Sequence, residues 1–171
     1  MKELILGGAR SGKSHYAETR AIESGLDVIY IATAQALDDE MQLRIKHHQQ
    51  QRPAHWRLIE EPIELLSVLK ENANASTCIL VDCLTLWVSN QLCSNKHKQQ
   101  IEKNSESLAS LLPTLSGNII FVSNEVSMGV TPMGEMSRQF VDESGRLHQR
   151  LAAVCDKVTL MVAGIPSQIK G

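Results

Sequence analysis

A glycine-rich stretch near the amino terminus carries the clearest chemical pattern in the sequence. Residues 7–14 read Gly-Gly-Ala-Arg-Ser-Gly-Lys-Ser and satisfy the phosphate-loop pattern GxxxxGK[ST]. Glycines let backbone N–H groups turn toward phosphate oxygens, and the following helix adds the positive end of its dipole. Lys13 supplies a point charge to the β- and γ-phosphates, and the Ser14 hydroxyl suits Mg²⁺. We expect the whole loop to contact nucleotide: Gly7, Gly8, Ala9, Arg10, Ser11, Gly12, Lys13 and Ser14. The alternative to a nucleotide site is an ordinary glycine-rich turn with a surface lysine.

A phosphate loop of this kind needs a second carboxylate at the magnesium, at the end of a neighbouring strand. Asp82 follows the apolar run 78–81 and is the candidate, so we expect Ser14 and Asp82 to hold the metal. An aspartate in this position is often only the N-cap of the next helix, here the segment 84–92, and the carboxylate could serve both purposes.

Short apolar runs alternate with longer segments of helical spacing, which predicts a parallel sheet covered on both faces. The expected strands centre on residues 4–6, 28–31, 78–81, 119–122 and 158–162, and the expected helices on 14–24, 38–51, 62–72, 84–92, 102–112 and 135–154. Residues 93–107 indicate an exposed loop that leads into a helix, and residues 128–136 a substrate-facing loop. We therefore expect one α/β domain, residues 1–171, of the three-layer P-loop NTPase (RecA-like) type with a mostly parallel sheet.

Composition excludes several other classes of protein. The 171 residues are 43% hydrophobic and 21% charged, which is ordinary globular usage. A net charge of −2 disfavours nucleic-acid partners. No apolar stretch is long enough to span a bilayer and no signal peptide is evident, so we expect a soluble, cytoplasmic protein. The spacing of the four cysteines fits neither a redox pair nor a zinc site and indicates buried thiols.

Further strings complement the phosphate loop over nearly the whole sequence, from residue 4 to about 166. They are residues 30–34 (Tyr-Ile-Ala-Thr-Ala), 39–41 (Asp-Glu-Met), Arg44, Ile45, His48, Arg52, Pro53, Trp56, Glu60, Pro62, 81–87 (Val-Asp-Cys-Leu-Thr-Leu-Trp), 122–126 (Val-Ser-Asn-Glu-Val), 145–147 and 151–153. Together they resemble the bifunctional adenosylcobinamide kinase / adenosylcobinamide-phosphate guanylyltransferases of cobalamin assembly. The strings around His48 and at 123–126 are the specific ones.

The resemblance implies two reactions and an assembly. Such enzymes phosphorylate adenosylcobinamide with ATP or GTP, then transfer GMP from GTP to that phosphate through a guanylyl-histidine, with Mg²⁺ as cofactor. The partners implied are the corrinoid and the nucleotides, in a homotrimer with no membrane span. Neutral imidazole is a competent nucleophile near pH 7.

Two adjacent histidines, His47 and His48, compete for the nucleophilic role. The family pattern favours His48, four residues after Arg44. Helical spacing agrees, because Met41, Arg44 and His48 fall on one face of the expected helix, with Arg44 close enough to contact phosphate. His47 flanks that face.

Other positions follow from the resemblance. The segments expected to line the guanine nucleotide are Thr33, Ala34 and Gln35, and Gln49, Gln50, Gln51 and Arg52. Glu60 matches an acidic nucleotide or metal contact, or is a solvated charge. Trp56 either stacks on a base or packs in the core. Ser123, Asn124 and Glu125 end a strand at the edge of the sheet where ligands bind. They either lie in the outer shell of the magnesium or contact the corrinoid. The remaining histidines, among them His148, are expected at the surface or in helix packing.

Two rival functions are compatible with the phosphate loop alone. A monofunctional small-molecule kinase would transfer only the γ-phosphoryl group and form no covalent protein species. A RecA-like ATPase or regulatory module would hydrolyse nucleotide slowly and engage a polymer or protein partner.

Overall fold

Strands and helices alternate along the described chain, as the sequence predicts. A computed structural model describes residues 1–35 and 53–171. The elements are β1 (Lys2–Gly7), α1 (Lys13–Glu23), β2 (Asp27–Ala32), β3 (Arg57–Glu60), α3 (Leu65–Asn72), β4 (Thr77–Asp82), α4 (Leu84–Cys93), η1 (Lys98–Gln100), α5 (Ile101–Leu111), η2 (Leu112–Thr114), β5 (Asn118–Asn124), α6 (Glu135–Val154), β6 (Lys157–Val162) and β7 (Ile165–Lys170). All five predicted strands are confirmed. The predicted helix 38–51 lies outside the described residues.

One seven-stranded sheet, in the order β3-β2-β4-β5-β1-β6-β7, holds every strand of the described residues. All neighbours are parallel except β6 and β7, which form an antiparallel hairpin. The central strands are buried on both faces, which explains why they appear in the sequence as unbroken apolar runs. The two edge strands, β3 and β7, were not predicted, because exposed edge strands need no such run.

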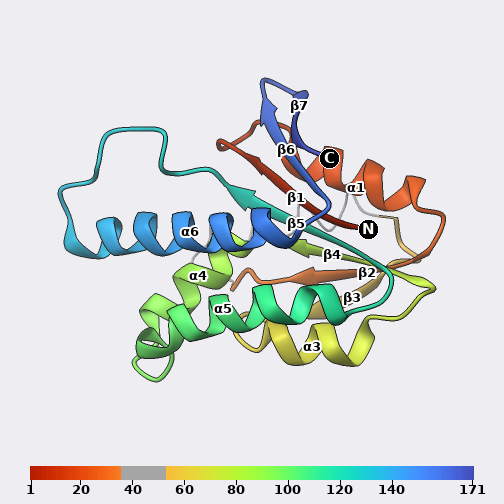
Figure 1. The fold of residues 1–171 in the computed structure, drawn as a ribbon, viewed down its shortest axis with the longest axis horizontal. Coiled ribbons are helices and arrows are strands. Elements are labelled where there is room, and N and C mark those ends of the chain that lie inside the picture. Colours follow the sequence, from red (N-terminus) through yellow and green to blue (C-terminus); the bar gives the residue numbers. More distant parts are fainter. Residues whose placement is uncertain (36–52) are drawn as a thin grey trace.

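Two hydrophobic clusters, one on each face of the sheet, hold the layers together. Helix α1 covers one face through Ala17 and Ala21, which pack with Tyr30, Leu80 and Val122. The other face, which includes Phe121 and Val81, packs against the opposite helices α3, α4, α5 and α6. Figure 1 shows α5 running beside α6, with α3 and α4 next to them. The predicted three-layer α/β arrangement is confirmed.

The carboxyl edge of the sheet carries the loops predicted to bind ligand. The phosphate loop leaves β1 there, and residues 125–134 leave β5 and extend away from the body before α6 begins (Figure 1). In open α/β sheets this edge is where ligands bind. The polar stretch after α4 becomes helical earlier than predicted, with η1 and then α5 from Ile101.

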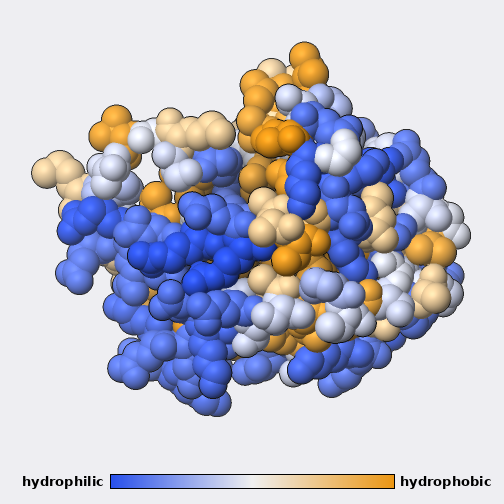
Figure 2. Space-filling view, in the orientation of Figure 1, coloured by the Kyte–Doolittle hydropathy of each residue, from blue (hydrophilic) through white to orange (hydrophobic). Residues whose placement is uncertain are grey.

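The surface corrects one expectation about the cysteines. Cys78, Cys83 and Cys155 are buried, as predicted, but Cys93 is exposed because it is the last residue of α4, at a turn into solvent. Exposed apolar side chains gather on two segments. One is the β6–β7 hairpin, orange at the top of Figure 2, with Val162, Ile165 and Ile169. The other is the segment 128–136, with Met128, Val130, Met133 and Met136. Among the helices of the described residues, none combines the length and the apolar character needed to span a bilayer.

Candidate active site

The phosphate loop forms a tight turn between β1 and α1. The Ser11 amide donates to the Gly8 carbonyl (3.3 Å), and the Tyr16 amide donates to the Gly12 carbonyl (3.0 Å) as α1 begins. Gly12 adopts φ of 92°, in the left-handed region that favours glycine. A Cβ on Gly7 would lie 2.6 Å from the Met161 carbonyl oxygen of β6, so only glycine fits there. The predicted strand-loop-helix context is present.

The first part of the phosphate loop is open to solvent, and the part that leads into α1 is largely buried. Gly8, Ala9 and Arg10 are exposed, whereas Ser11 and Lys13 are buried. The Ser11 hydroxyl oxygen has no hydrogen-bond partner within residues 1–35 and 53–171. A buried, unpaired hydroxyl beside open backbone is suited to a polar ligand such as phosphate.

Lys13 is held inside the loop that it is expected to serve. Its ammonium group donates to the Gly8 carbonyl at 2.6 Å. Burial lowers the pKa of Lys13, and the charge of Asp82 opposes that effect. Cys83 opposes it as well, so Lys13 lies close enough to interact electrostatically with both residues at the end of β4.

Asp82 ends β4 at the same edge of the sheet. Its Oδ2 accepts a hydrogen bond of 2.9 Å from the Tyr30 hydroxyl on β2. The alternative role as helix N-cap is wrong, because Cys83 occupies that position of α4 and no side chain caps the helix. Burial and the neighbouring Asp82 charge raise the pKa of Cys83 to about 12, so this thiol stays protonated and is no nucleophile.

The predicted guanine-lining segment after β2 begins with a residue engaged in the fold. Thr33 is fully buried; its hydroxyl donates to the Cys83 carbonyl (2.7 Å) and accepts from the Cys83 amide (2.9 Å). Ala34 is half-buried and Gln35 exposed. Glu60, at the end of β3, is exposed. Thr33, Glu60 and Asp82 therefore share the carboxyl edge, because their strands are parallel neighbours.

Several predicted site residues lie outside the described part of the chain. These are Arg44, both histidines His47 and His48, Gln49, Gln50, Gln51 and Arg52. Trp56 is described, and it is buried in the α1-side core cluster, as the packing alternative requires.

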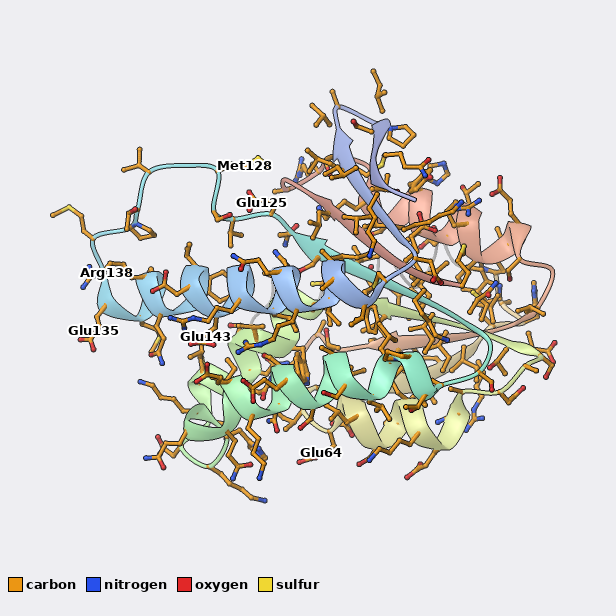
Figure 3. All side chains as sticks on the ribbon, viewed as in Figure 1. Glu64, Glu125, Met128, Glu135, Arg138 and Glu143 are labelled. Atoms are coloured by element: carbon orange, nitrogen blue, oxygen red, sulfur yellow. The ribbon has the colours of Figure 1, made fainter. Side chains whose placement is uncertain are left out.

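The β6–β7 hairpin and the end of β5 also contact the phosphate loop, and the sequence did not indicate either contact. The Gly164 amide donates to the Ser11 carbonyl (3.0 Å), so the hairpin turn supports the loop. The Glu125 amide donates to the Gly7 carbonyl (3.0 Å). In Figure 3, Glu125 lies where β5 ends, near the tip of β1. Strand neighbours so distant in sequence become visible only once the sheet order is known.

The whole chain matches proteins of cobalamin biosynthesis. It is 54% identical over 171 residues to the bifunctional adenosylcobalamin biosynthesis protein CobP of Pseudomonas aeruginosa, covering 100% of this chain and 98% of the relative. It is 38% identical over 182 residues to the bifunctional adenosylcobalamin biosynthesis protein CobU of Escherichia coli, covering 99% and 100%.

Solved structures of low sequence identity share the fold. The P4 protein of bacteriophage phi6, in complex with ADP, has a TM-score of 0.54 at 14% identity, covering 97% of this chain and 53% of the phage protein. The RadB recombinase has a TM-score of 0.52 at 15% identity, covering 93% and 73%. The expected P-loop NTPase fold is confirmed; this chain spans about half the length of the phage protein.

The family comparison confirms the resemblance found in the sequence. The model described as "Cobinamide kinase / cobinamide phosphate guanyltransferase" matches residues 3–169. The chain belongs to the cobinamide kinase / cobinamide phosphate guanyltransferase family.

Proposed function

We propose that this protein phosphorylates adenosylcobinamide with ATP or GTP and then converts the product to adenosylcobinamide-GDP with GMP taken from GTP. Membership of the family supports both reactions. The observation that carries the proposal is the buried Lys13 inside a phosphate loop, with Asp82 at the end of β4 on the same carboxyl edge of the sheet. One cradle serves both reactions, because each begins with a bound nucleoside triphosphate.

In the kinase reaction, the substrate hydroxyl oxygen attacks the γ-phosphorus, the bond to the β,γ-bridging oxygen breaks, and the nucleoside diphosphate and the hydroxyl proton are released. Lys13 and the amides of the loop stabilise the charge that spreads over the transferred group. The hydroxyl of Ser14 and the carboxylate of Asp82 are oxygen donors of the kind Mg²⁺ prefers, and they are the residues that would hold it. When bound, the metal neutralises charge on the β- and γ-oxygens.

In the guanylyl transfer, a ring nitrogen of His48 attacks the α-phosphorus of GTP and pyrophosphate leaves. A phosphate oxygen of adenosylcobinamide phosphate then attacks the same phosphorus and releases the imidazole. We assign His48 rather than His47 from the family pattern, with Arg44 as a phosphate contact. Ala34, Gln35, the segment Gln49–Arg52 and Glu60 are proposed to line the guanine nucleotide. Thr33, which is fully buried, is proposed to support this lining by holding the start of the segment 33–35 against Cys83.

Mass spectrometry after incubation with Mg²⁺ and GTP tests the proposal. We expect a mass gain of one GMP on the peptide that contains His47 and His48, stable to base and labile to acid. His48→Ala should remove it, and His47→Ala should retain it. An undiminished adduct in His48→Ala would overturn the assignment. No adduct in the wild type, together with transfer of γ-phosphate to adenosylcobinamide, would leave only the monofunctional kinase.

The same resemblance suggests how the chain assembles. We infer a cytoplasmic homotrimer in which residues 1–171 act as one catalytic domain. Sedimentation velocity should give a single species of three times the chain mass, and a monomer that performs both reactions would contradict this.

A further inference from the structure

A buried polar cluster of Thr85, Ser123 and His148 lies beneath the carboxyl edge of the sheet. The three side chains come from α4, β5 and α6, and each is nine-tenths buried or more. The Ser123 hydroxyl lies 2.7 Å from Nε2 of His148 and 3.2 Å from the Thr85 hydroxyl. The Thr85 hydroxyl in turn accepts the amide of Asn124 at 2.7 Å. Three packed elements therefore converge on one backbone N–H.

The hydrogen bonds of the cluster can run in one direction. An amide only donates, so Thr85 accepts from Asn124 and has its own proton for Ser123. Ser123 then donates to Nε2 of His148, which requires a neutral ring protonated on Nδ1. Burial lowers the pKa of His148 to about 4, against the attraction of Glu125, and a ring neutral at pH 7 meets that requirement.

The peptide held by the cluster borders the phosphate loop. Asn124 pairs with Gly7 in the β1–β5 register, and the next amide, of Glu125, donates to the Gly7 carbonyl. Ile120 and Val122 face the α1 side of the sheet, so strand alternation places Asn124 on that same side. That is the side on which Tyr30 contacts Asp82.

Glu125 extends the restraint into the loop that follows. Partial burial opposes its ionisation, but hydrogen bonds from Ser127 and from the Met128 amide outweigh burial and lower the pKa of Glu125. The Met128 amide donates to Oε2 at 3.0 Å. Figure 3 shows Glu125 and Met128 at the start of the segment 125–134. The root of this loop is thus fixed to the phosphate loop and to the cluster.

We propose that Thr85, Ser123 and His148 are positioning residues that fix Asn124 beside the phosphoryl group in transfer. The inference rests on the proposed kinase reaction. The triphosphate is bound by Lys13 and the loop between β1 and α1, so nucleotide affinity does not depend on the cluster. Turnover does, because a small displacement of a group at the reacting centre slows the chemical step strongly.

Steady-state kinetics of γ-phosphoryl transfer to adenosylcobinamide test the proposal. His148→Phe fills the ring volume without an acceptor, whereas His148→Gln returns a polar atom near the position of Nε2. We expect His148→Phe to lower kcat about tenfold with KM for ATP within about twofold, and His148→Gln to recover most of the loss. Ser105→Ala is the matched control: Ser105 is also buried, but its hydroxyl donates to the Ile101 carbonyl of its own helix, α5. It should keep kcat whatever stability it loses.

A second pair keeps the test independent of folding defects at His148. Thr85→Val removes the hydroxyl at nearly constant shape, and Thr85→Ser retains it, so only the valine variant should lose turnover. The proposal would be overturned if both His148→Phe and Thr85→Val kept the wild-type kcat. It would also be overturned if their losses of kcat matched the unfolded fraction of each variant and His148→Gln and Thr85→Ser failed to restore it. A wild-type protein that transfers no phosphate would instead refute the proposed function.

Discussion

The hydroxyl of Tyr30 donates a 2.9 Å hydrogen bond to Oδ2 of Asp82, and so joins the buried middle of the sheet to a carboxylate that acts on Lys13. Tyr30 is 4% exposed, and its ring packs in the cluster beneath α1. A phenol held in the core restricts the rotation of the carboxylate. The orientation of the proposed metal ligand is therefore set by the adjacent strand β2.

Tyr30→Phe removes that restraint and should weaken Mg²⁺ binding. We expect the Mg²⁺ concentration for half-maximal phosphoryl transfer to rise about tenfold, since loss of a hydrogen bond that orients a ligand commonly costs about tenfold or more in metal affinity. Titration of activity with Mg²⁺ at saturating ATP measures this. Tyr16→Phe is the control, because Tyr16 packs at the edge of the same cluster. Equal metal dependence in the two variants would contradict the role of Tyr30.

Lys13→Met should impair both reactions, because both are proposed to use one phosphate cradle. We expect phosphoryl transfer and guanylyl transfer each to fall by about 10²–10³-fold, the usual cost of losing one charge-stabilising donor. His48→Ala should abolish guanylyl transfer alone. Assays with γ-labelled ATP and α-labelled GTP separate the two. Lys103→Met, at an exposed lysine of α5, serves as the control. A Lys13→Met protein that keeps either reaction would show that two triphosphate sites exist.

The sequence predicted the central strands and the phosphate loop because their physical constraints are local. A strand buried on both faces, such as residues 119–122, must be apolar throughout. The phosphate loop needs glycine at position 7, where a Cβ would meet the Met161 carbonyl, and at position 12, where φ is positive. The edge strands β3 and β7 are not subject to the constraint of burial on both faces. Their residues are largely exposed, so nothing in their composition distinguishes them from loops.

The sequence predicted residues of the candidate site, but it did not predict which side chains form hydrogen bonds with one another. Asp82 follows from the strand that precedes it, but its partner Tyr30 is 52 positions away. Ser123 and His148 are 25 positions apart and meet only because α6 packs back over β5. Such pairs depend on sheet order and helix packing, which strand and helix patterns do not determine. His148, expected at the surface or in helix packing, is buried where α6 packs against the sheet, and its bond to Ser123 was not predicted.

Trp87→Phe should destabilise the protein without changing its chemistry. The indole is fully buried, and its Nε1 donates to the Ile63 carbonyl at 2.7 Å, linking α4 to the segment before α3. Removing the donor takes this bond from the partly buried Ile63 carbonyl and leaves a small void, a loss of about 2 kcal/mol. Urea denaturation followed by circular dichroism measures it. Trp56→Phe, at the less completely buried tryptophan, is expected to cost less, and the reverse order would refute this account of the packing.

The stability of the protein should fall as the pH drops from about 6.5 toward 4, because of His148. Burial lowers the pKa of His148 to about 4, whereas the unfolded imidazole titrates near 6.5. Above pH 6.5 the ring is neutral in both states and its contribution is constant. Below that pH the unfolded state binds the proton first, so the free energy of unfolding decreases, by about 3 kcal/mol once both states are protonated.

Urea denaturation between pH 7.5 and 5 isolates this effect, since carboxylates of lowered pKa, such as Glu125, stay ionised throughout. His148→Phe removes the titrating group and should flatten the dependence, while His15→Phe, at an exposed histidine, should leave it unchanged. The sign is the decisive feature. A ring that accepted its proton inside the fold would make the protein more stable as the pH drops, and the bond from Ser123 to Nε2 would then have to run the other way.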